Sequence, residues 1–561
     1  MSENRLKLIQ GVVESNEDSD VTRLTLASKV VGGEEKEMLR SEAVERRLQH
    51  ATEELVVWIK RRAQESQAFF YFERGLIPLV FRIGCWATLL YLTLREEALQ
   101  AGFQHRVQQY KRWFTKQEPK RRILTIFFGQ VAYFRTYYYS EEKEGKNSKG
   151  VGFHPLDHEL GLSSDAFSLH VVSLAARLAA MMPYAAAAQL LQLFIGGNPS
   201  QTAIEHMVLG LGTHTQDYFT QAFPPRGDGE ILVIMIDCKA VPTATAGELR
   251  KRRGKRKPKL KWSSARHQGR HNRKGWQQKS RRKKGDKRKN GRAATLVVMY
   301  TLKASPEEGL LCGPINKRVF ASFAPKRFAF AYARREAEKR GFAPGSNHLI
   351  QFVSDGDRDF RIYLEEYFSE YADHEFMQTI DLMHVMEYVW EAGHAQFTAG
   401  SDALATWAQK QKKRLLESRA DLVLVDLRRF LEQVPKTGPG NKSKRERIED
   451  AIRYLESNLD RMDYRYYRDS DLELASGAVE GAVKYVIGFR LDNGGMRWIV
   501  ERAEAILQLR CIMINGQWDD FIAWYHEQLQ QRLKQSPRQQ ILRDKPHPLP
   551  SVEKPAQKAA A

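Results

Sequence analysis

The chain has 561 residues, of which 42% are hydrophobic and 10% aromatic, a composition that excludes a largely disordered protein and allows more than one hydrophobic core. Its four cysteines are too far apart in sequence for a zinc ribbon or a disulfide scaffold, so a reducing, intracellular setting is expected. The net charge of +21 is confined to residues 250–292, which hold 22 Lys or Arg and one acid, whereas the other 518 residues carry 67 Lys or Arg and 67 Asp or Glu.

Residues 1–120 are predicted to be mostly helical, because apolar residues recur at three- and four-residue spacing as far as residue 114. The apolar run 75–94 is about as long as a membrane span, but Pro78 and Arg82 interrupt it. We therefore expect a buried helix of a soluble domain here rather than a membrane-spanning helix, and no membrane partner. This helical region is the candidate for recognition of DNA ends.

Residues 121–228 are predicted to combine a β-hairpin with a helical linker domain. The alternating, β-rich pattern of residues 121–140 favours a hairpin with its turn at Gly129-Gln130. From about residue 154 to residue 212 the chain is rich in Ala and Leu, and we expect helices there.

Residues 229–389 carry the pattern of a mixed α/β core. The continuous apolar run 230–241 is typical of a buried central strand and contains Asp237 near its C-terminal end. Two more strands, a helix, a strand that delivers Asp355 into an Asp-Gly turn, a helix and a last strand follow. This order of elements is that of a ribonuclease-H-like fold, in which the first and fourth strands lie side by side, so that acids on both would meet.

The basic segment 250–292 interrupts this core. Such a dense cluster is expected to contact a polyanion, most simply DNA or RNA, through backbone phosphates and without reading sequence. A solvated loop or a localisation signal is the alternative. The candidate DNA-binding residues here are Lys251, Arg252, Arg253, Lys255, Arg256, Lys257, Arg281, Arg282, Lys283 and Lys284.

The C-terminal part is predicted to be helical. Residues 390–470 are strongly charged and expected to be helical, 471–535 contain Glu480 at a helix start and the last helices, and 536–561 are expected to be a disordered tail.

Three acids, Asp237, Asp355 and Glu480, are therefore candidates for one site. Each has a structural alternative: a strand-end acid, an Asp-Gly turn, and a first-turn acid that the helix dipole favours. Phosphodiester cleavage or transfer requires an activated nucleophile and stabilised phosphate charge, which two Mg²⁺ ions held by carboxylates supply.

The stretch 476–521 closely resembles the C-terminal signature of ISKra4-family bacterial insertion-sequence transposases. The matching motifs are Gly477–Glu480, Gly488–Arg490, Gly495–Trp498, Glu504–Arg510 and Asn515–Trp518. Two further blocks also resemble the family. One consists of "VSDGDRDF" and "TIDLMHVMEYVWEAGHA", and the other of "GQVAYFRTYYY" and "HPLDHELGL". The resemblance therefore covers roughly residues 120 to 525.

The resemblance implies a DDE transposase with an RNase-H-like core and a helical insertion before the catalytic Glu. By motif, the catalytic and metal-binding acids fall on Asp237, Asp355 and Glu480, with two Mg²⁺ ions as cofactor and Mn²⁺ as a substitute. Asp381 and His384 match an Asp-x-x-His feature and are accessory candidates, or else a capping Asp and a packed His. Further DNA-binding candidates are Lys484, Arg490 and Arg497, with solvated basic side chains as the alternative.

The expected function is Mg²⁺-dependent cleavage at transposon ends and strand transfer into target DNA. The expected partners are double-stranded DNA and further copies of the chain, in a homodimer or a larger synaptic assembly, and the expected location is the bacterial cytoplasm at the nucleoid. A non-catalytic, domesticated nucleic-acid-binding protein and a nuclease on the same fold are the alternatives.

Overall fold

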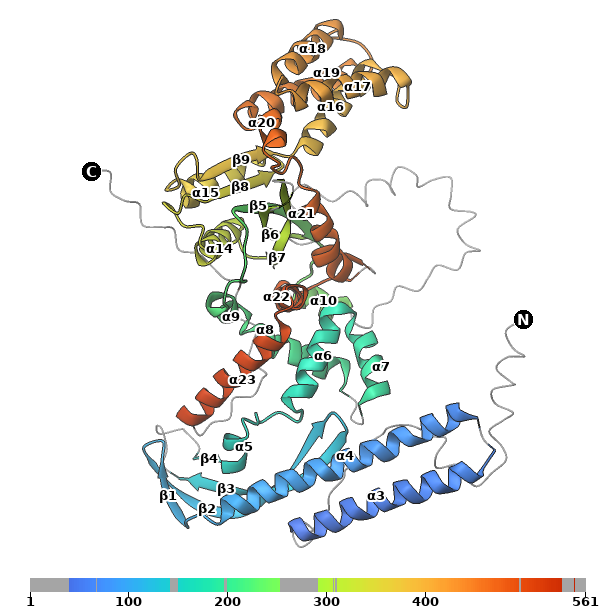
Figure 1. Ribbon diagram of the computed structural model, residues 1–561, viewed down its shortest axis with the longest axis vertical. Helices are drawn as coiled ribbons and strands as arrows, with labels where there is room; N and C mark the ends of the chain where they lie inside the picture. The colour runs from blue at the N-terminus through green and yellow to red at the C-terminus, as the bar shows by residue number, and fades with distance from the viewer. Residues whose placement is uncertain are drawn as a thin grey trace. The chain divides into compact units, whose positions relative to one another are not determined.

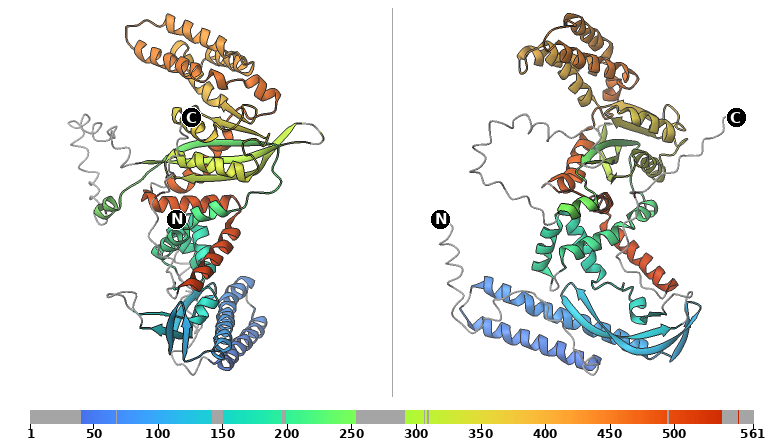
Figure 2. Two further views of the ribbon diagram at one scale, coloured as in Figure 1. Left: turned by 90° about the vertical axis from the view of Figure 1, so that its left-hand side faces the viewer. Right: turned by 180° about the vertical axis from the view of Figure 1, so that it is seen from behind.

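The computed structural model describes residues 40–66, 68–141, 150–195, 199–252, 291–305, 307, 310–493, 496–536 and 549. The chain is mixed α/β and divides into two compact units (Figures 1 and 2). The first unit contains the described residues up to His214 together with those from Trp518 to Ser536, and the second contains Thr215–Gln517.

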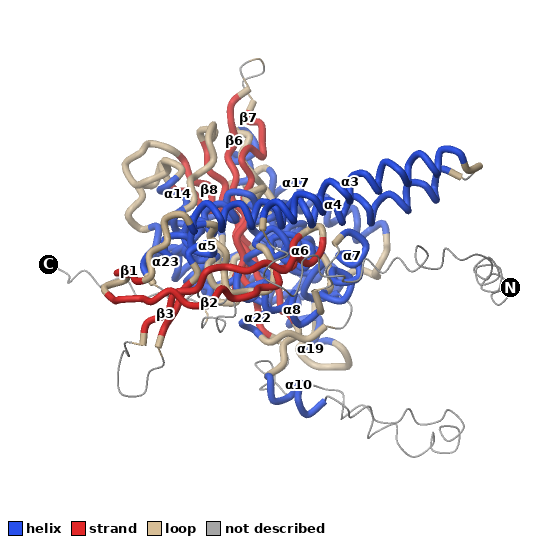
Figure 3. The backbone as a smooth tube through the Cα atoms, turned by 90° about the horizontal axis from the view of Figure 1, so that it is seen from below, coloured by secondary structure: helices blue, strands red, loops and turns tan. Residues whose placement is uncertain are grey.

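The first unit joins two long helices to a small antiparallel sheet. Helix α3 lies beside α4, and the backbone N–H of Ser41 donates to Glu97 (2.8 Å; Figure 3). The sheet has the strand order β1-β2-β3-β4. The bounds are α3 Ser41–Gln64, α4 Phe69–Gln100, β1 Arg106–Gln109, β2 Arg112–Ile126, β3 Gly129–Ser140, β4 Val151–Phe153, α5 Pro155–Glu159, α6 Leu169–Met181, α7 Tyr184–Phe194, α8 Gln201–Gly212 and α23 Trp518–Gln535.

The sequence prediction for this unit is confirmed for its helices and wrong for residues 106–120. That stretch forms β1 and the first half of β2, because β2 pairs along the aromatic-rich strand β3 and β1 pairs in turn with β2. Phe114, fully buried in this sheet, packs in a cluster with Tyr138. Cross-strand packing of this kind overrides a helical pattern. The hairpin turn lies at Phe127-Phe128 rather than at Gly129-Gln130, since Ile126 pairs with Gly129.

Helix α4 is long and apolar enough to cross a membrane by length and composition alone, with a mean hydropathy of 1.6 in its most apolar 18-residue window. Only 22% of that window is buried, so the expectation of a buried helix is wrong for most of it. Leu89 and Leu92 pack on the sheet around Val131, whereas Phe69 and Phe70 at the other end of the helix are exposed.

The second unit is built on a five-stranded sheet with the order β7-β6-β5-β8-β9. Strands β5, β6 and β7 pair antiparallel, and β5 with β8 and β8 with β9 pair parallel. The predicted succession of strands and helices is confirmed, and the first and fourth strands are neighbours as expected. The bounds are α9 Thr215–Gln221, β5 Ile231–Val241, α10 Ala246–Arg252, β6 Arg292–Ala304, β7 Leu311–Ser322, α14 Lys326–Lys339, β8 Leu349–Ser354, α15 Arg358–Phe368 and β9 Phe376–Ile380.

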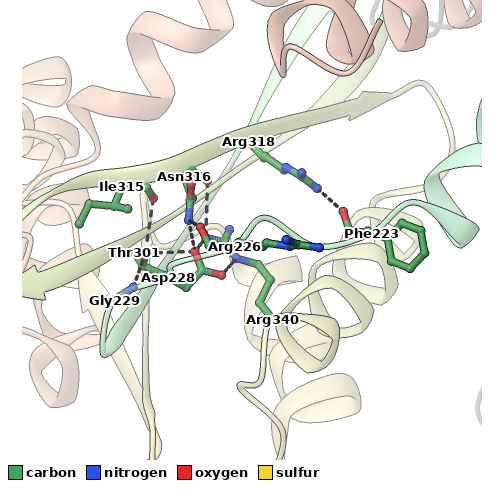
Figure 4. Close-up of polar contacts among 9 residues, drawn as sticks. All are labelled: Phe223, Arg226, Asp228, Gly229, Thr301, Ile315, Asn316, Arg318 and Arg340. Atoms are coloured by element: carbon green, nitrogen blue, oxygen red, sulfur yellow. Dashed lines mark hydrogen bonds and ion pairs between the residues drawn. The ribbon is translucent and has the colours of Figure 1, made fainter. Parts of the chain in front are cut away.

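The start of β5, the strand that carries Asp237, is anchored by Asp228 (Figure 4). Arg340, just after α14, donates to both oxygens of this carboxylate (2.6 and 2.9 Å), and Asn316 on β7 donates at 2.9 Å. Burial opposes the charge of Asp228, but the hydrogen bonds from Arg340 and Asn316 outweigh it and lower the pKa. The central strand is thereby tied to β7 and to the end of α14.

The predicted helical region after the sheet is confirmed. Its helices enclose a separate apolar core that includes Val385, Leu427 and Leu455. A short helix, a π-helical segment Val483–Asp492 and a nearly all-buried helix follow. The bounds are α16 Leu382–Gln396, α17 Asp402–Leu416, α18 Ala420–Gln433, α19 Asn441–Glu456, α20 Tyr464–Asp469, α21 Gly477–Ala482 and α22 Val500–Ile514.

Glu504 on α22 is a buried carboxylate that holds the end of β7. The Ser322 hydroxyl and the Phe323 backbone N–H each donate to it at 2.6 Å, and Gln508 donates at 2.5 Å. Burial nevertheless raises the pKa of Glu504 from 4.5 to about 7.

This raised pKa predicts a pH-dependent stability. The folded state binds the Glu504 proton more tightly than the unfolded state, so stability is fully present below pH 4.5 and falls as the pH rises to about 7. The loss should be about 3 kcal/mol, measured as the difference between wild type and Glu504→Gln in urea unfolding at each pH. Parallel pH profiles for the two proteins would contradict this role of Glu504.

Candidate active site

The sheet brings Asp237 and Asp355 together. Strand β5 pairs with β8 in a parallel register in which Met235 lies opposite Val353. When this register is continued by two residues, Asp355, which directly follows β8, stands opposite Asp237. Neighbouring strands are about 4.8 Å apart and residues at equal register face the same side of a sheet, so the two half-buried carboxylates share one face.

Glu480 belongs to the same electrostatic neighbourhood. It is exposed on α21, at the end of its first turn. Burial raises the pKa of Asp237, and the negative charges of Asp355 and Glu480 raise it further. The Cys238 backbone N–H, which donates to Asp237 (2.5 Å), and His384 act in the opposite direction. The charges of Asp355, Glu480 and His384 therefore all act on Asp237.

In the described part of the chain, no Lys or Arg pairs with any of the three acids. Nearby lysines are engaged elsewhere, Lys239 with Asp492 (3.2 Å) and Lys326 with Asp357 (2.5 Å). Over the described ranges, Asp237, Asp355 and Glu480 take part in no ion pair. Crowded carboxylates without a counter-ion favour a bound cation.

The donor set fits a hard divalent ion, because Mg²⁺ and Mn²⁺ prefer carboxylate oxygens. In the part of the chain that the structure describes, however, no group of three or more His, Cys, Asp or Glu side chains is arranged to hold a metal ion. Asp237 and Asp355 share a sheet edge, but Glu480 is not gathered with them into one coordination site.

A chain of hydrogen bonds links the two segments that carry Asp355 and Glu480. The backbone N–H of fully buried Asp381 donates to the carbonyl of Ser354 (2.8 Å), next to Asp355. The Ser476 hydroxyl donates to the Asp381 carboxylate, and the Ser476 carbonyl accepts the N–H of Glu480 (3.1 Å). Asp381 thus fixes where α21 begins.

Of the two accessory candidates, Asp381 has the capping position. It caps the N-terminus of α16, accepting the N–H of Met383 at 2.7 Å, and faces Ser476. His384 is half-buried one turn later, pairs with Glu387 (3.1 Å) and acts on Asp237. The sequence reasoning missed Ser476, for which the only signal was its place directly before the Gly477 helix start.

The predicted DNA-binding residues near Glu480 divide in two. Lys484 and Arg497 are exposed, as phosphate contact requires. The prediction for Arg490 is wrong as the chain is folded: its side chain is 1% exposed and lies over the ring of Trp498 at 4.9 Å. The π-helical segment turns Arg490 inward, where it stacks in the core. Trp498 is itself buried.

The strands on either side of the basic segment pair at the end of the sheet that carries the site. Val241 at the end of β5 pairs with Arg292 at the start of β6, and Ala244 donates to the carbonyl of Trp498 (2.8 Å). Lys251 and Arg252 end α10, with side chains outside the description. The other candidates lie outside the described residues: Arg253, Lys255, Arg256, Lys257, Arg281, Arg282, Lys283 and Lys284.

No family model matches the chain, and no curated protein matches it. A solved structure to which it is similar is the Drosophila P element transposase strand transfer complex, at 13% identity, covering 64% of this chain and 95% of that one with a TM-score of 0.28. A similarity at this TM-score assigns neither a fold nor a function to the chain.

The link through Asp381 predicts local protection of the Glu480 helix. Ser476→Ala should remove the hydroxyl that anchors α21 and leave a buried carboxylate short of one partner, at a cost of about 1–3 kcal/mol. The amides of Val479 and Glu480 should then exchange hydrogen faster, as measured by mass spectrometry.

The matched control is Ser457→Ala, which removes an exposed hydroxyl that donates to Arg453 on α19. It should leave exchange in α21 unchanged. Unaltered exchange of Val479 and Glu480 in Ser476→Ala would show that the hydroxyl does not hold the helix.

Proposed function

We propose that the chain is a DDE-type DNA transposase of the ISKra4 kind, which cleaves DNA at the ends of a mobile element and transfers the strand to target DNA. The observation that carries this proposal is the register of β5 and β8, which sets Asp237 beside Asp355. The action of the Glu480 charge on Asp237 extends it to the third acid.

Two further features support the proposal. The sheet order β7-β6-β5-β8-β9, with an antiparallel half and a parallel half, is the order expected of a ribonuclease-H-like core. Helices α16 to α20 then occupy the place of the insertion before the catalytic Glu. Within the sequence, the motifs around Glu480 and Asp355 resemble those of the transposase family.

In this proposal Asp237 and Asp355 would hold the metal from the sheet, and Glu480 would complete the ligand set from α21. When bound, two Mg²⁺ ions activate water and the 3′-hydroxyl and neutralise charge on the phosphate. The hydrogen bond from Ser476 to Asp381 would position the start of α21, and with it Glu480, for this role. Because α21 is short and exposed, we expect DNA and metal together to draw Glu480 toward the two aspartates.

The cationic residues would hold the DNA. Lys484 and Arg497, both exposed, follow Glu480 in sequence and suit phosphate contact. The segment 250–292 would bind the DNA backbone, and the N-terminal helices would recognise the element's ends. Two ends must be joined, so we propose a homodimer or larger synaptic assembly acting at the bacterial nucleoid.

The first test removes one carboxylate at a time. Asp237→Asn, Asp355→Asn and Glu480→Gln should each lower Mg²⁺-dependent cleavage at least about 100-fold, because each loses a metal ligand. The substrate is the DNA on either side of the reading frame, where this proposal expects inverted repeats, and strand cleavage is followed on gels. Asp402→Asn and Glu432→Gln, exposed acids of α17 and α18, are the matched controls and should keep full activity.

The second test concerns the basic segment. Replacing residues 253–290 with a short Gly-Ser linker should flatten the fall of DNA affinity with rising salt, because fewer counter-ions are released on binding. The slope of the logarithm of affinity against the logarithm of salt concentration is the measurement. An unchanged slope would remove this segment from the DNA interface.

A non-catalytic DNA-binding protein is the second candidate. It is favoured by one observation, that the described acids are not gathered into a metal site. Such a protein would bind DNA with the same salt dependence and show no metal-dependent cleavage. A nuclease on the same fold would cleave without joining, so a strand-transfer assay distinguishes it.

A further inference from the structure

A cavity of about 740 Å³ opens directly beside Asp355, within the second unit. One wall is the turn Asp355–Asp357 with the first turn of α15, and the other is formed by α19 and its C-terminal end, with Tyr388 of α16. Its volume is within the range of about 300–1,000 Å³ that is usual for small-ligand sites. None of the sequence motifs predicts this cavity.

Arginine side chains line the cavity, and three of them are exposed enough to bind an anion. Within the described chain Arg358 forms no ion pair and is exposed. Arg361 pairs with Asp460 (2.7 Å) and Arg453 with Asp450 (3.0 Å), all of them more than half exposed. Exposed ion pairs of this kind add little to the stability of the fold. A phosphate, which a guanidinium binds with two hydrogen bonds, can therefore replace the carboxylate.

An aromatic pair completes the lining. The rings of Tyr388 and Tyr454 are stacked, with centroids 4.0 Å apart and planes 16° apart. The Tyr454 hydroxyl donates to the carbonyl of Asp355 (2.8 Å), which fixes the pair relative to the candidate catalytic acid. An aromatic face beside arginines is the usual platform for a stacked base next to its phosphate.

The acids of the lining do not prevent this. Asp357 is paired with Lys326. Asp450 would give up its pair with Arg453 to the phosphate, but its side chain is more than half exposed, so water and salt screen its charge. Only Asp355 is without a cationic partner in the described chain, and it is the acid to which we assign the metal. The phosphate of a ligand is therefore expected on the arginines of α15 and α19, away from Asp355.

We propose that this cavity binds a single nucleotide, with its base against Tyr388 and its phosphate on Arg358 and Arg453. The source is an unpaired nucleotide of the DNA strand that is cut or joined at Asp355, and in this the inference rests on the proposed function. Arginine and tyrosine here set the position of the strand rather than perform the reaction.

The probe is a short duplex with one unpaired 2-aminopurine at a 3′ overhang, added to the full-length protein in EDTA so that no cleavage occurs. Stacking on Tyr388 should quench the 2-aminopurine fluorescence, and a fully paired duplex with an interior 2-aminopurine should be unaffected. Tyr388→Ala should abolish the quenching and Tyr388→Phe should keep it. Arg358→Ala should lower the ratio of docked to undocked overhang about tenfold.

The matched controls are Tyr466→Ala and Arg465→Ala, exposed residues of α20 outside the cavity, which should quench like wild type. Gel shifts run in parallel separate loss of docking from loss of DNA binding. Quenching in Tyr388→Ala equal to that of wild type, or none in wild type, would overturn the inference. Displacement of the overhang by excess free dAMP, with DNA binding intact, would assign the cavity to a free nucleotide.

The fluorescence quenching is measured in EDTA, so its result does not depend on whether the protein cleaves DNA. If the cavity binds the overhang but Asp355→Asn still cleaves, the proposed catalytic assignment fails and the cavity stands. If cleavage depends on the acids but the overhang is not quenched, only the cavity assignment fails.

Discussion

The parallel pairing of β5 with β8 is the constraint on which the site depends. Side chains alternate between the two faces of a strand, so a slip of one residue in this pairing would send Asp237 and Asp355 to opposite faces. The residues from Leu232 to Ile236 are apolar and buried, and their packing holds the strand in this register. At the other end Asp228, fixed by Arg340 and Asn316, sets where β5 begins. The sheet thereby forces two like charges together, and the raised pKa of Asp237 reflects this crowding along with its burial.

The third acid is positioned by different means. Glu480 follows helices α16–α20 in sequence and lies on α21 rather than on a strand. Buried Asp381 joins the end of β8 to the start of α21 through Ser476, so the helix that carries Glu480 starts from a fixed point. Buried Asp381 needs its hydrogen bonds from Met383 and Ser476, because a buried carboxylate without partners would destabilise the fold. This requirement favours the one arrangement in which Ser476 lies beside Asp381. The turn Asp355–Asp357 also lines the cavity. Tyr454, another lining residue, donates a hydrogen bond to the carbonyl of Asp355.

Much of the second unit could be predicted from the sequence, because β5 and β8 are apolar runs with an acid near or just after the C-terminal end and because its helices have clear apolar periods. The position of Asp237 beside Asp355 followed from the order of elements. Arg490 could not be placed, since only the π-helical turn reveals that its side chain points into the core toward Trp498. The helix predicted for residues 106–120 was wrong because pairing of β2 with β3, which the local apolar spacing does not reveal, decides the structure of this stretch. The roles of Ser476 and Tyr388 depend on contacts across more than 60 residues of sequence, which no local pattern contains.

The central claim is that Asp237, Asp355 and Glu480 together hold two divalent ions when DNA is present. Electron paramagnetic resonance of Mn²⁺, titrated into the protein with end-containing DNA, measures this directly. The account predicts about two bound ions per site for wild type, and loss of this binding in the Asp237→Asn/Asp355→Asn double variant with DNA affinity retained. Equal Mn²⁺ binding by wild type and the double variant would contradict it.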